Sequence, residues 1–405
     1  MEVRFPLILD GATGTELQKR GYQGDVSAEQ WVLEHPEVIV ELQRGYVDAG
    51  SQVVYAPTFG ANRQKLEEHR IFNRVEDYNV RLTALSRQAA AGRAWVAGDL
   101  SPTGQFLAPL GGASFEELVD IYTEQAAALE KAGVDLFVVE TMMTLSDARA
   151  AVLAIRSVSS KPTLVSFTCD ENGRTLSGTD VAAALVVLQG MGVSAFGLNC
   201  STGPDKMLAQ LRRLRKYARI PLMAKPNAGM PKVMGDKTVY DCPPEGFAAY
   251  ADEMVQAGVG VFGGCCGTDS RYIAALKEAL DGKRFVPPAP EHTELLPAAT
   301  EKLPFLLPVD AGHGPALSAG EDMEEAIEQA LEGGEPTLAM HIGTWEDVDE
   351  LADWQYAMTK PLCLICEDGA LLEAALRVYQ GRALYEGGLP EETLLPLSRR
   401  YGLLI

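Results

Sequence analysis

Short apolar runs recur along the first 281 residues of this chain, and a longer amphipathic stretch follows each of them. This alternation is typical of repeated βα units, in which a buried parallel strand leads into a helix that covers it. The pattern predicts eight strands, at residues 5–9, 52–56, 94–97, 136–139, 163–167, 194–198, 221–224 and 259–262.

The intervening segments have the length and periodicity of helices, as at 37–49, 115–132, 180–191 and 204–217. Eight βα units in about 280 residues match a (β/α)8 barrel. The alternative, an open doubly wound sheet, usually has fewer strands and a glycine-rich phosphate loop after the first strand. Here the first run leads into "DGATGT" at 10–15, which lacks both the GxGxxG spacing and the P-loop lysine. We therefore predict an α/β fold of the TIM-barrel type.

Polar side chains follow each predicted strand, at the end where barrel enzymes place their catalytic loops. Because these ends meet at one rim of a closed barrel, residues far apart in the sequence are expected to lie together there. The candidates in chain order are Asp10, Thr58, Asp99, Ser101, Glu140, Thr168, Asn199, Cys200, Lys225, Asn227, Cys265 and Cys266.

Three of these candidates are thiols. Cys200 follows the sixth strand, and the adjacent Cys265 and Cys266 follow the eighth, between glycines that permit a bend. Three thiolates suit Zn²⁺ and leave its fourth position open to a substrate. Two alternatives stay open: the cysteines are small buried apolar residues, or the adjacent pair forms a strained disulfide.

The other cysteines carry weaker signals. Cys169 and Cys242 have no cysteine near them in the sequence. Cys363 and Cys366 have CxxC spacing but lie in the apolar run "PLCLIC", where residues three apart face opposite sides of a strand. We do not expect a redox or metal motif there.

Seven blocks in order resemble the homocysteine S-methyltransferase family, especially the N-terminal module of cobalamin-dependent methionine synthase. They are "ILDGATGTELQKRG", "APTFGANRQKL", "VVETMMTLSDA", "TLSGTD", "GLNCSTGP", "KPNAGMP" and "GGCCGT", and the similarity spans residues 3–281. The resemblance implies a zinc-binding (β/α)8 barrel at 1–284 that binds homocysteine and produces methionine.

The resemblance also implies residue roles. The zinc ligands, and with them the catalytic centre, would be Cys200, Cys265 and Cys266, with Asn227 as an exchangeable fourth ligand while substrate is absent. The substrate-binding candidates are Asp10, Gly11, Thr58, Glu140, Asn199 and Asn227, of which Asp10 and Glu140 would surround the ammonium group. For these two carboxylates the alternative is helix capping or a strand-end salt bridge, and for Thr58, Asn199 and Ser201 it is the satisfaction of loop backbone groups.

Chemistry supports the zinc interpretation. A free thiol titrates near pH ~8.5, and only its thiolate attacks a methyl group well. A bound zinc ion lowers that pKa.

The chain changes character after residue 284. Residues 285–304 are rich in proline, which disfavours helix and central strand, and predict a linker. Residues 305–405 return to βα rhythm, and "LLEAALRVYQGRALYEGG" from Leu371 faintly resembles a pterin-binding module, so we expect a truncated, degenerate half-barrel with a packing or docking role. Folate binding is not expected. His313 and His341 raise the alternative of a second site, but we prefer a loop turn and a strand end.

Composition narrows the class of partner. A formal charge of −21 opposes nucleic acids and anionic membranes. No apolar run approaches the ~20 residues that cross a bilayer, and an odd count of scattered cysteines with no signal peptide predicts a cytoplasmic protein.

The methyl donor is the least constrained element of this hypothesis. The D-x-H-x-x-G arrangement that supplies a cobalt-ligating histidine does not occur in the sequence, so we expect methylcobalamin on a separate corrinoid protein. Alternatives are S-methylmethionine or betaine as donor, another thiol as acceptor, or a noncatalytic zinc-binding protein that docks on a corrinoid or folate methyltransferase and regulates it.

Overall fold

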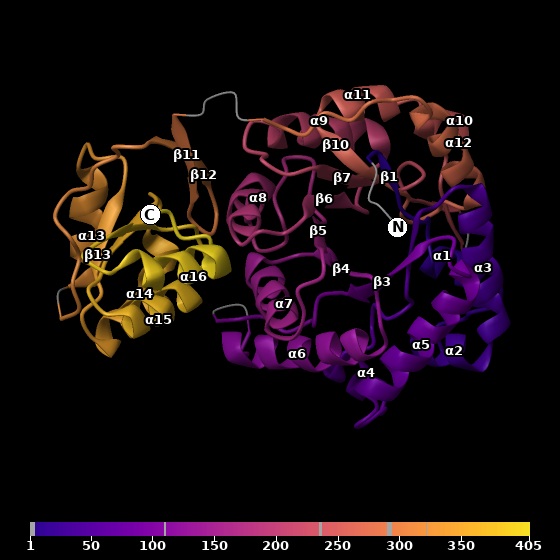
Figure 1. Ribbon diagram of the computed structural model, residues 1–405, viewed down its shortest axis with the longest axis horizontal. Coiled ribbons are helices and arrows are strands. Elements are labelled where there is room, and N and C mark those ends of the chain that lie inside the picture. The colour runs from indigo at the N-terminus through magenta and orange to yellow at the C-terminus, as the bar shows by residue number, and fades with distance from the viewer. Residues whose placement is uncertain (1–4, 109–110, 235–236, 290–293, 321) are drawn as a thin grey trace. The chain divides into compact units, whose positions relative to one another are not determined.

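The computed structural model describes residues 5–108, 111–234, 237–289, 294–320 and 322–405 (Figure 1). The chain forms two compact units. The first comprises Met1–Asn172, Ser194–Arg215 and Ile220–Pro288, and the second comprises Gly173–Val193, Lys216–Arg219 and Ala289–Ile405.

The first unit is built on an eight-stranded parallel sheet with the order β1-β10-β7-β6-β5-β4-β3-β2. Its strands are β1 (Leu7–Ile8), β2 (Val53–Tyr55), β3 (Trp95–Leu100), β4 (Leu136–Met142), β5 (Thr163–Phe167), β6 (Ala195–Asn199), β7 (Leu222–Lys225) and β10 (Val259–Phe262). The two end strands meet through Gln52, whose amide donates to the carbonyl of Ile8 at 2.7 Å. The predicted TIM-barrel architecture is confirmed.

Helices surround these strands, as Figure 1 shows for α3, α5 and α6. The helices of the first unit are α1 (Gly14–Lys19), α2 (Ala28–Glu34), α3 (Pro36–Ala49), α4 (Arg63–Glu68), α5 (Val75–Ala90), α6 (Phe115–Lys131), α7 (Leu145–Val158), α9 (Pro204–Leu214), α10 (Pro244–Ala248), α11 (Ala251–Gln256) and α12 (Ser270–Leu280). Local chemistry sets their ends: Ser114 and Glu117 form a capping box before α6, and Gly50 ends α3 with a φ of 118°. Within the described residues, the helices are too short or too polar to span a membrane.

The barrel interior is filled by side chains from all eight strands. Alternate residues of each strand point inward, and they form one buried apolar cluster. Its members are Leu7, Leu9, Val53, Tyr55, Ala97, Leu136, Val138, Leu164, Ala195, Met223 and Val261. Full burial of each larger apolar side chain contributes about 1.5–3 kcal/mol, so this packed interior holds the strand ends in place around the rim.

A small antiparallel hairpin interrupts the βα rhythm after β7. It consists of β8 (Lys232–Met234) and β9 (Lys237–Val239). The sequence pattern did not predict it. Its second strand leads directly into Tyr240, which lies at the site described below.

The second unit is a smaller α/β structure. Its parallel sheet contains β13 (Leu338–His341), β14 (Leu362–Ile365) and β15 (Leu384–Glu386), and a hairpin pairs β11 (Leu295–Ala299) with β12 (Pro304–Pro308). The helices are α8 (Val181–Gly190), α13 (Met323–Glu332), α14 (Trp345–Trp354), α15 (Gly369–Val378) and α16 (Glu391–Tyr401), with a 3₁₀ turn η1 at Gln355–Ala357.

The hairpin corrects the expected linker at 285–304. Pro297 and Pro304 lie in strands, which proline tolerates here because both strands of a two-stranded hairpin are edges. Residues 290–293 of that segment lie outside the described residues.

Candidate functional site

Three thiols from two separate loops converge at the carboxyl ends of the barrel strands. The sulfur atoms of Cys200, Cys265 and Cys266 all lie within 4.8 Å of one another, and the Cys200–Cys266 distance is 4.0 Å. All three are free thiols, so the adjacent pair forms no disulfide. Tetrahedral zinc with bonds of about 2.3 Å requires sulfurs about 3.8 Å apart, and the cluster fits that requirement closely.

The loop after β7 holds both thiol loops. The Cys200 amide donates to the Lys225 carbonyl at 3.1 Å, and the Cys265 amide donates to the Pro226 carbonyl at 2.8 Å. Cys200 and Ser201 both adopt left-handed backbone conformations, with φ of 58° and 60°. Such conformations cost about 1–3 kcal/mol for non-glycine residues and cluster at functional sites.

Glycines next to the cysteine pair answer two different steric demands. A Cβ on Gly264 would lie 2.3 Å from the hydroxyl oxygen of Thr268. Gly267 has a φ of 82°, and a Cβ there would lie 2.5 Å from the Tyr240 ring. The bend that turns both thiols toward Cys200 therefore requires small residues at these two positions.

The thiols share negative charge unequally. Hydrogen bonds from Cys265 and then Cys266 lower the pKa of Cys200. Hydrogen bonds with Cys200 and then Cys266 raise the pKa of Cys265. The contact with Cys200 raises the pKa of Cys266 to about 11, and hydrogen bonds with Cys265 and then Tyr240 partly offset this. One thiolate stabilised by two thiols is the arrangement that a soft cation would complete by displacing the remaining protons.

Two asparagines border the thiols. Asn227 contacts Cys200 through a hydrogen bond that lowers the thiol pKa, while its buried Oδ1 has no hydrogen-bond partner. An unsatisfied carbonyl oxygen beside three sulfurs suits the predicted exchangeable fourth ligand. Asn199 accepts a hydrogen bond from the Thr141 amide at 3.0 Å and donates to the Thr141 hydroxyl at 2.7 Å. It therefore holds the end of β4 in place next to Glu140.

A buried ion cluster lies at the same end of the barrel. The ammonium of Lys225 lies 3.3 Å from Asp10 and 3.7 Å from Glu140, and it sits over the Tyr55 ring at 3.6 Å from the centroid. The other oxygen of Asp10 accepts the Tyr55 amide at 2.7 Å. Both charged side chains of the Asp10–Lys225 pair are almost fully buried.

The cluster carries more acid than base. Burial raises the pKa of Asp10 and of Glu140, and Lys225 opposes this shift in both cases. Burial, followed by electrostatic repulsion from Glu140, raises the pKa of Asp99 well above its ordinary value. Asp10 and Glu140 thus share the one ammonium of Lys225, and a second cation would balance their charges.

The thiols and the ion cluster line one cavity of about 370 Å³. Asp10, Gly11, Asp99, Glu140, Cys200, Lys225, Cys265 and Cys266 contribute to its wall. Apolar residues from α1, α2 and the β2 loop, including Leu17, Val32 and Phe59, line another part. The cavity can hold a small molecule that has a soft atom at one end and a positive charge at the other.

One of the predicted substrate contacts, Thr58, has a structural role instead. Thr58 is fully buried, and its hydroxyl donates to the Asp99 carbonyl at 2.9 Å and accepts the Asp99 amide at 3.1 Å. It ties β2 to β3 rather than lining the cavity. Gly11 does line the cavity, and a Cβ there would lie only 2.7 Å from the Tyr46 ring, so this position requires glycine.

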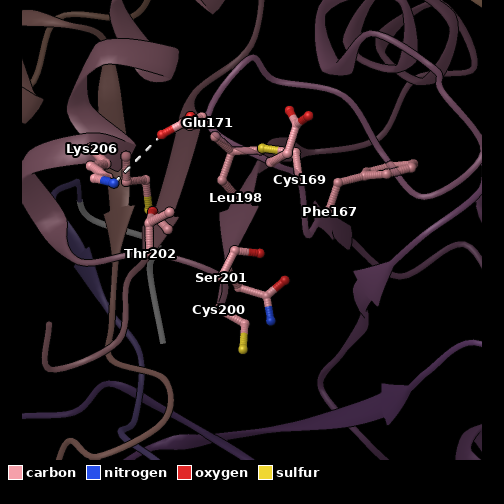
Figure 2. Close-up of a pocket in the computed structure, with 11 residues that line it drawn as sticks. Phe167, Cys169, Glu171, Leu198, Cys200, Ser201, Thr202 and Lys206 are labelled. Carbon is pink, nitrogen blue, oxygen red and sulfur yellow. Dashed lines mark ion pairs between the residues drawn. The ribbon is translucent and has the colours of Figure 1, made fainter. Parts of the chain in front are cut away.

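Cys169 and Cys242 do not join the thiol cluster. Figure 2 shows the small hollow beside β5 and β6, where the Cys200 side chain points away from Cys169. Lys206 and Glu171 form an ion pair at 3.6 Å on the outer side of this hollow. Ser201 hydrogen-bonds to Thr168, so its hydroxyl satisfies the neighbouring loop.

Sequence reasoning noted Lys225 after the seventh strand but gave it no role, and it missed Tyr55 and Tyr240. A lysine at the end of an apolar strand was the available signal for Lys225. No sequence signal pointed to Tyr240, because its position depends on the unexpected β8–β9 hairpin.

Comparisons with known proteins agree with this geometry. The family model described as homocysteine S-methyltransferase matches residues 7–280. Methionine synthases from Mycobacterium leprae and Mycobacterium tuberculosis are each 33% identical, over 73% and 68% of this chain. The alignments cover 26% and 24% of those proteins, so the chain spans about a quarter of their length.

Solved structures also match. The metallated form of the homocysteine methyltransferase MmuM from Escherichia coli is 27% identical, with a TM-score of 0.59 over 67% of this chain and 95% of that one. The apo form gives 26% identity and a TM-score of 0.55 over the same shares.

Proposed function

The chain belongs to the homocysteine S-methyltransferase family, and we propose that it transfers a methyl group to the thiol of homocysteine in a zinc-dependent reaction that yields methionine. The observation that carries the proposal is the convergence of Cys200, Cys265 and Cys266 with an acid-rich ion cluster in one cavity.

The cluster of three thiols fits zinc by donor type and spacing, and all three cysteines line the cavity that would hold the substrate. Zinc bound there supplies Lewis acidity that lowers the pKa of a substrate thiol, while thiolate ligands keep the sulfur electron-rich. The chain's own groups orient the substrate. Asp10 and Glu140 receive its ammonium group, because Lys225 balances only one of their two charges.

The methyl donor in this proposal is a separate methylcorrinoid protein. Similarity to methionine synthases supports it. The apolar wall formed by Leu17, Val32 and Phe59 is suited to contact an apolar methyl-carrying face.

The test measures zinc content and methionine formation in parallel. The full chain is incubated with homocysteine and methylcobalamin, S-methylmethionine or betaine. We expect turnover with methylcobalamin, and Cys200→Ser should lose about one zinc per chain together with activity. Cys242→Ser, which removes a thiol outside the cluster, should change neither.

Each contrary result identifies another hypothesis. Turnover only with S-methylmethionine or betaine would show that a small sulfonium or ammonium compound, and not a corrinoid protein, is the methyl donor. Bound zinc without turnover from any donor would favour a docking or regulatory protein. Full zinc content in Cys200→Ser would contradict the site itself.

A further inference from the structure

The second unit brings together three metal-binding side chains that lie far apart in the sequence. His313 forms a bridge with Thr337, two residues before Ala339, and Ala339 pairs with Cys363 in β14. Glu386 ends β15 and pairs with Ile365, two residues after Cys363. Because parallel partners point the same way and side chains alternate along a strand, all three lie on one face of the sheet.

Their donor atoms are close enough to share an ion. Nε2 of His313 lies 3.1 Å from a carboxylate oxygen of Glu386. One ring nitrogen of His313, one carboxylate oxygen of Glu386 and the sulfur of Cys363 all lie within 4.8 Å of one another. Tetrahedral zinc with nitrogen and oxygen ligands at about 2.0–2.1 Å places those atoms about 3.3 Å apart. The imidazole and the carboxylate already have this separation, and a small side-chain rotation brings in the thiol.

The imidazole of His313 is fixed in the orientation that metal-binding histidines adopt. Its Nδ1 lies 2.7 Å from the carbonyl oxygen of Gly314, which can only accept, so Nδ1 carries the proton. Nε2, which donates to Glu386 as the ring stands, is then the nitrogen whose proton a bound cation would replace. A backbone carbonyl that holds the second ring nitrogen is the usual support of a histidine ligand.

The cysteine distinguishes this cluster from an ordinary ion pair. An imidazolium–carboxylate pair needs only His313 and Glu386, and because Glu386 is 62% exposed such a pair stabilises the fold only weakly. Such a pair does not require Cys363, which is only 5% exposed and whose sulfur lies next to the pair. Cys366, the other cysteine of the CxxC sequence, turns away, and its sulfur contacts the carbonyl of Asp368 at 3.1 Å.

We propose that His313, Cys363 and Glu386 form a second zinc site, with its fourth position open to water on the exposed side of Glu386. One imidazole, one thiolate and one carboxylate are ligands that zinc accepts together, whereas magnesium and calcium prefer oxygen alone. Bound zinc would link the segment before β13 to β14 and β15. This site is independent of methyl transfer in the barrel.

The test compares zinc content per chain between matched variants of the full protein. Cys363→Ala should hold about one zinc fewer than its parent, while Cys366→Ala should match the parent. The comparison is repeated with each change made separately in the Cys200→Ser background, which separates this site from the barrel thiols. There too, Cys363→Ala should lower the zinc content and Cys366→Ala should not. Co²⁺ added to Cys200→Ser protein should give a thiolate-to-metal absorption band that Cys363→Ala abolishes.

Glu386→Gln provides a second variant at an exposed position, in case the buried substitution prevents folding. Loss of one ligand should weaken zinc affinity at least 10-fold, measured by competition with a chromophoric chelator. Equal zinc content and equal affinity in Cys363→Ala, Glu386→Gln and their parent would overturn the proposal.

Discussion

Strained and buried residues concentrate at the carboxyl rim of the barrel. Thr141 and Cys200 are non-glycine residues with φ of 59° and 58°, and both border the cavity. Lys225 and Asp10 are charged groups with almost no exposure. Each of these features costs free energy, and surrounding packing must offset it. Such a concentration is expected where a site requires a specific geometry.

Replacing Lys225 with methionine should destabilise the fold strongly. The change leaves Asp10 and Glu140 buried without their cation, which typically costs about 3–5 kcal/mol. Urea unfolding measures the free energy. The control is Lys131→Met, which removes an ion pair with Glu76 whose partners are 64% and 63% exposed, and it should cost at most about 1 kcal/mol. Equal losses in the two variants would show that the buried cluster is not held by its charges.

Glu140→Gln should impair recognition of the substrate's ammonium group. Loss of one charge-assisted contact is worth about 1.5–3 kcal/mol, so kcat/KM for homocysteine should fall about 10- to 100-fold. An analogue without the amino group should be affected far less by this change. Glu124→Gln, on the exposed side of α6, serves as the control. An equal loss for both substrates would assign Glu140 a role other than ammonium binding.

At the scale of elements, the strands were predicted closely because periodicity reports burial directly. The predicted runs at 163–167 and 259–262 coincide with β5 and β10. β1 is shorter than its run at 5–9, and Pro6 within that run cannot donate to a strand ladder. The β11–β12 hairpin was read as a linker, because proline spacing does not reveal whether a strand has one neighbour or two.

The first turn of helix α7 contains an aspartate whose burial makes the stability of the fold depend on pH. Asp147 is 2% exposed, accepts hydrogen bonds from Tyr122 at 2.8 Å and Thr103 at 3.2 Å, and burial raises its pKa from 3.8 to about 6. The folded protein therefore binds more protons than the unfolded chain between these pH values. The stability contributed by the neutral acid is present below pH 4 and is lost as pH rises through 6.

Asp147→Asn should remove this dependence, because the amide stays neutral. Relative to the wild type, the variant should gain up to about 3 kcal/mol of unfolding free energy between pH 4 and pH 8. Denaturant titrations across that range measure the difference. Asp120→Asn, at an exposed position of α6, should run parallel to the wild type. A variant whose curve also stays parallel would show that Asp147 does not titrate in this window.

At the scale of the whole molecule, α8 is unusual because it is apolar all round. Residues Val181 to Leu188 have no exposed surface, and the helix packs against β11, β12 and α16 of the second unit. An apolar helix is stable in water only when all its faces are covered. The helix between β5 and β6 in the chain thus belongs with the second unit.

A chain that ends at Pro288 should therefore be compromised even though every barrel strand is retained. Removing β11, β12 and α16 exposes an apolar face of α8, which predicts lower soluble yield, increased binding of a hydrophobic dye and a lower melting temperature. Size-exclusion chromatography and thermal unfolding measure these effects. A monomeric truncated chain with the melting temperature of the full protein would show that α8 needs no cover.

The sequence by itself determined the order of elements, the barrel and the set of polar residues at its rim. Hydrophobic periodicity and the polar or glycine residues that end each apolar run are local properties, and they directly reflect burial. Rim position already singled out the three barrel thiols as a candidate metal site, and motif resemblance added substrate-binding roles for Asp10 and Glu140. Tertiary structure alone decided that Lys225 lies between Asp10 and Glu140, that Thr58 serves the backbone, and that His313 meets Cys363 and Glu386. These pairings depend on strand register and loop closure across long stretches of chain, and a local pattern carries no information about either.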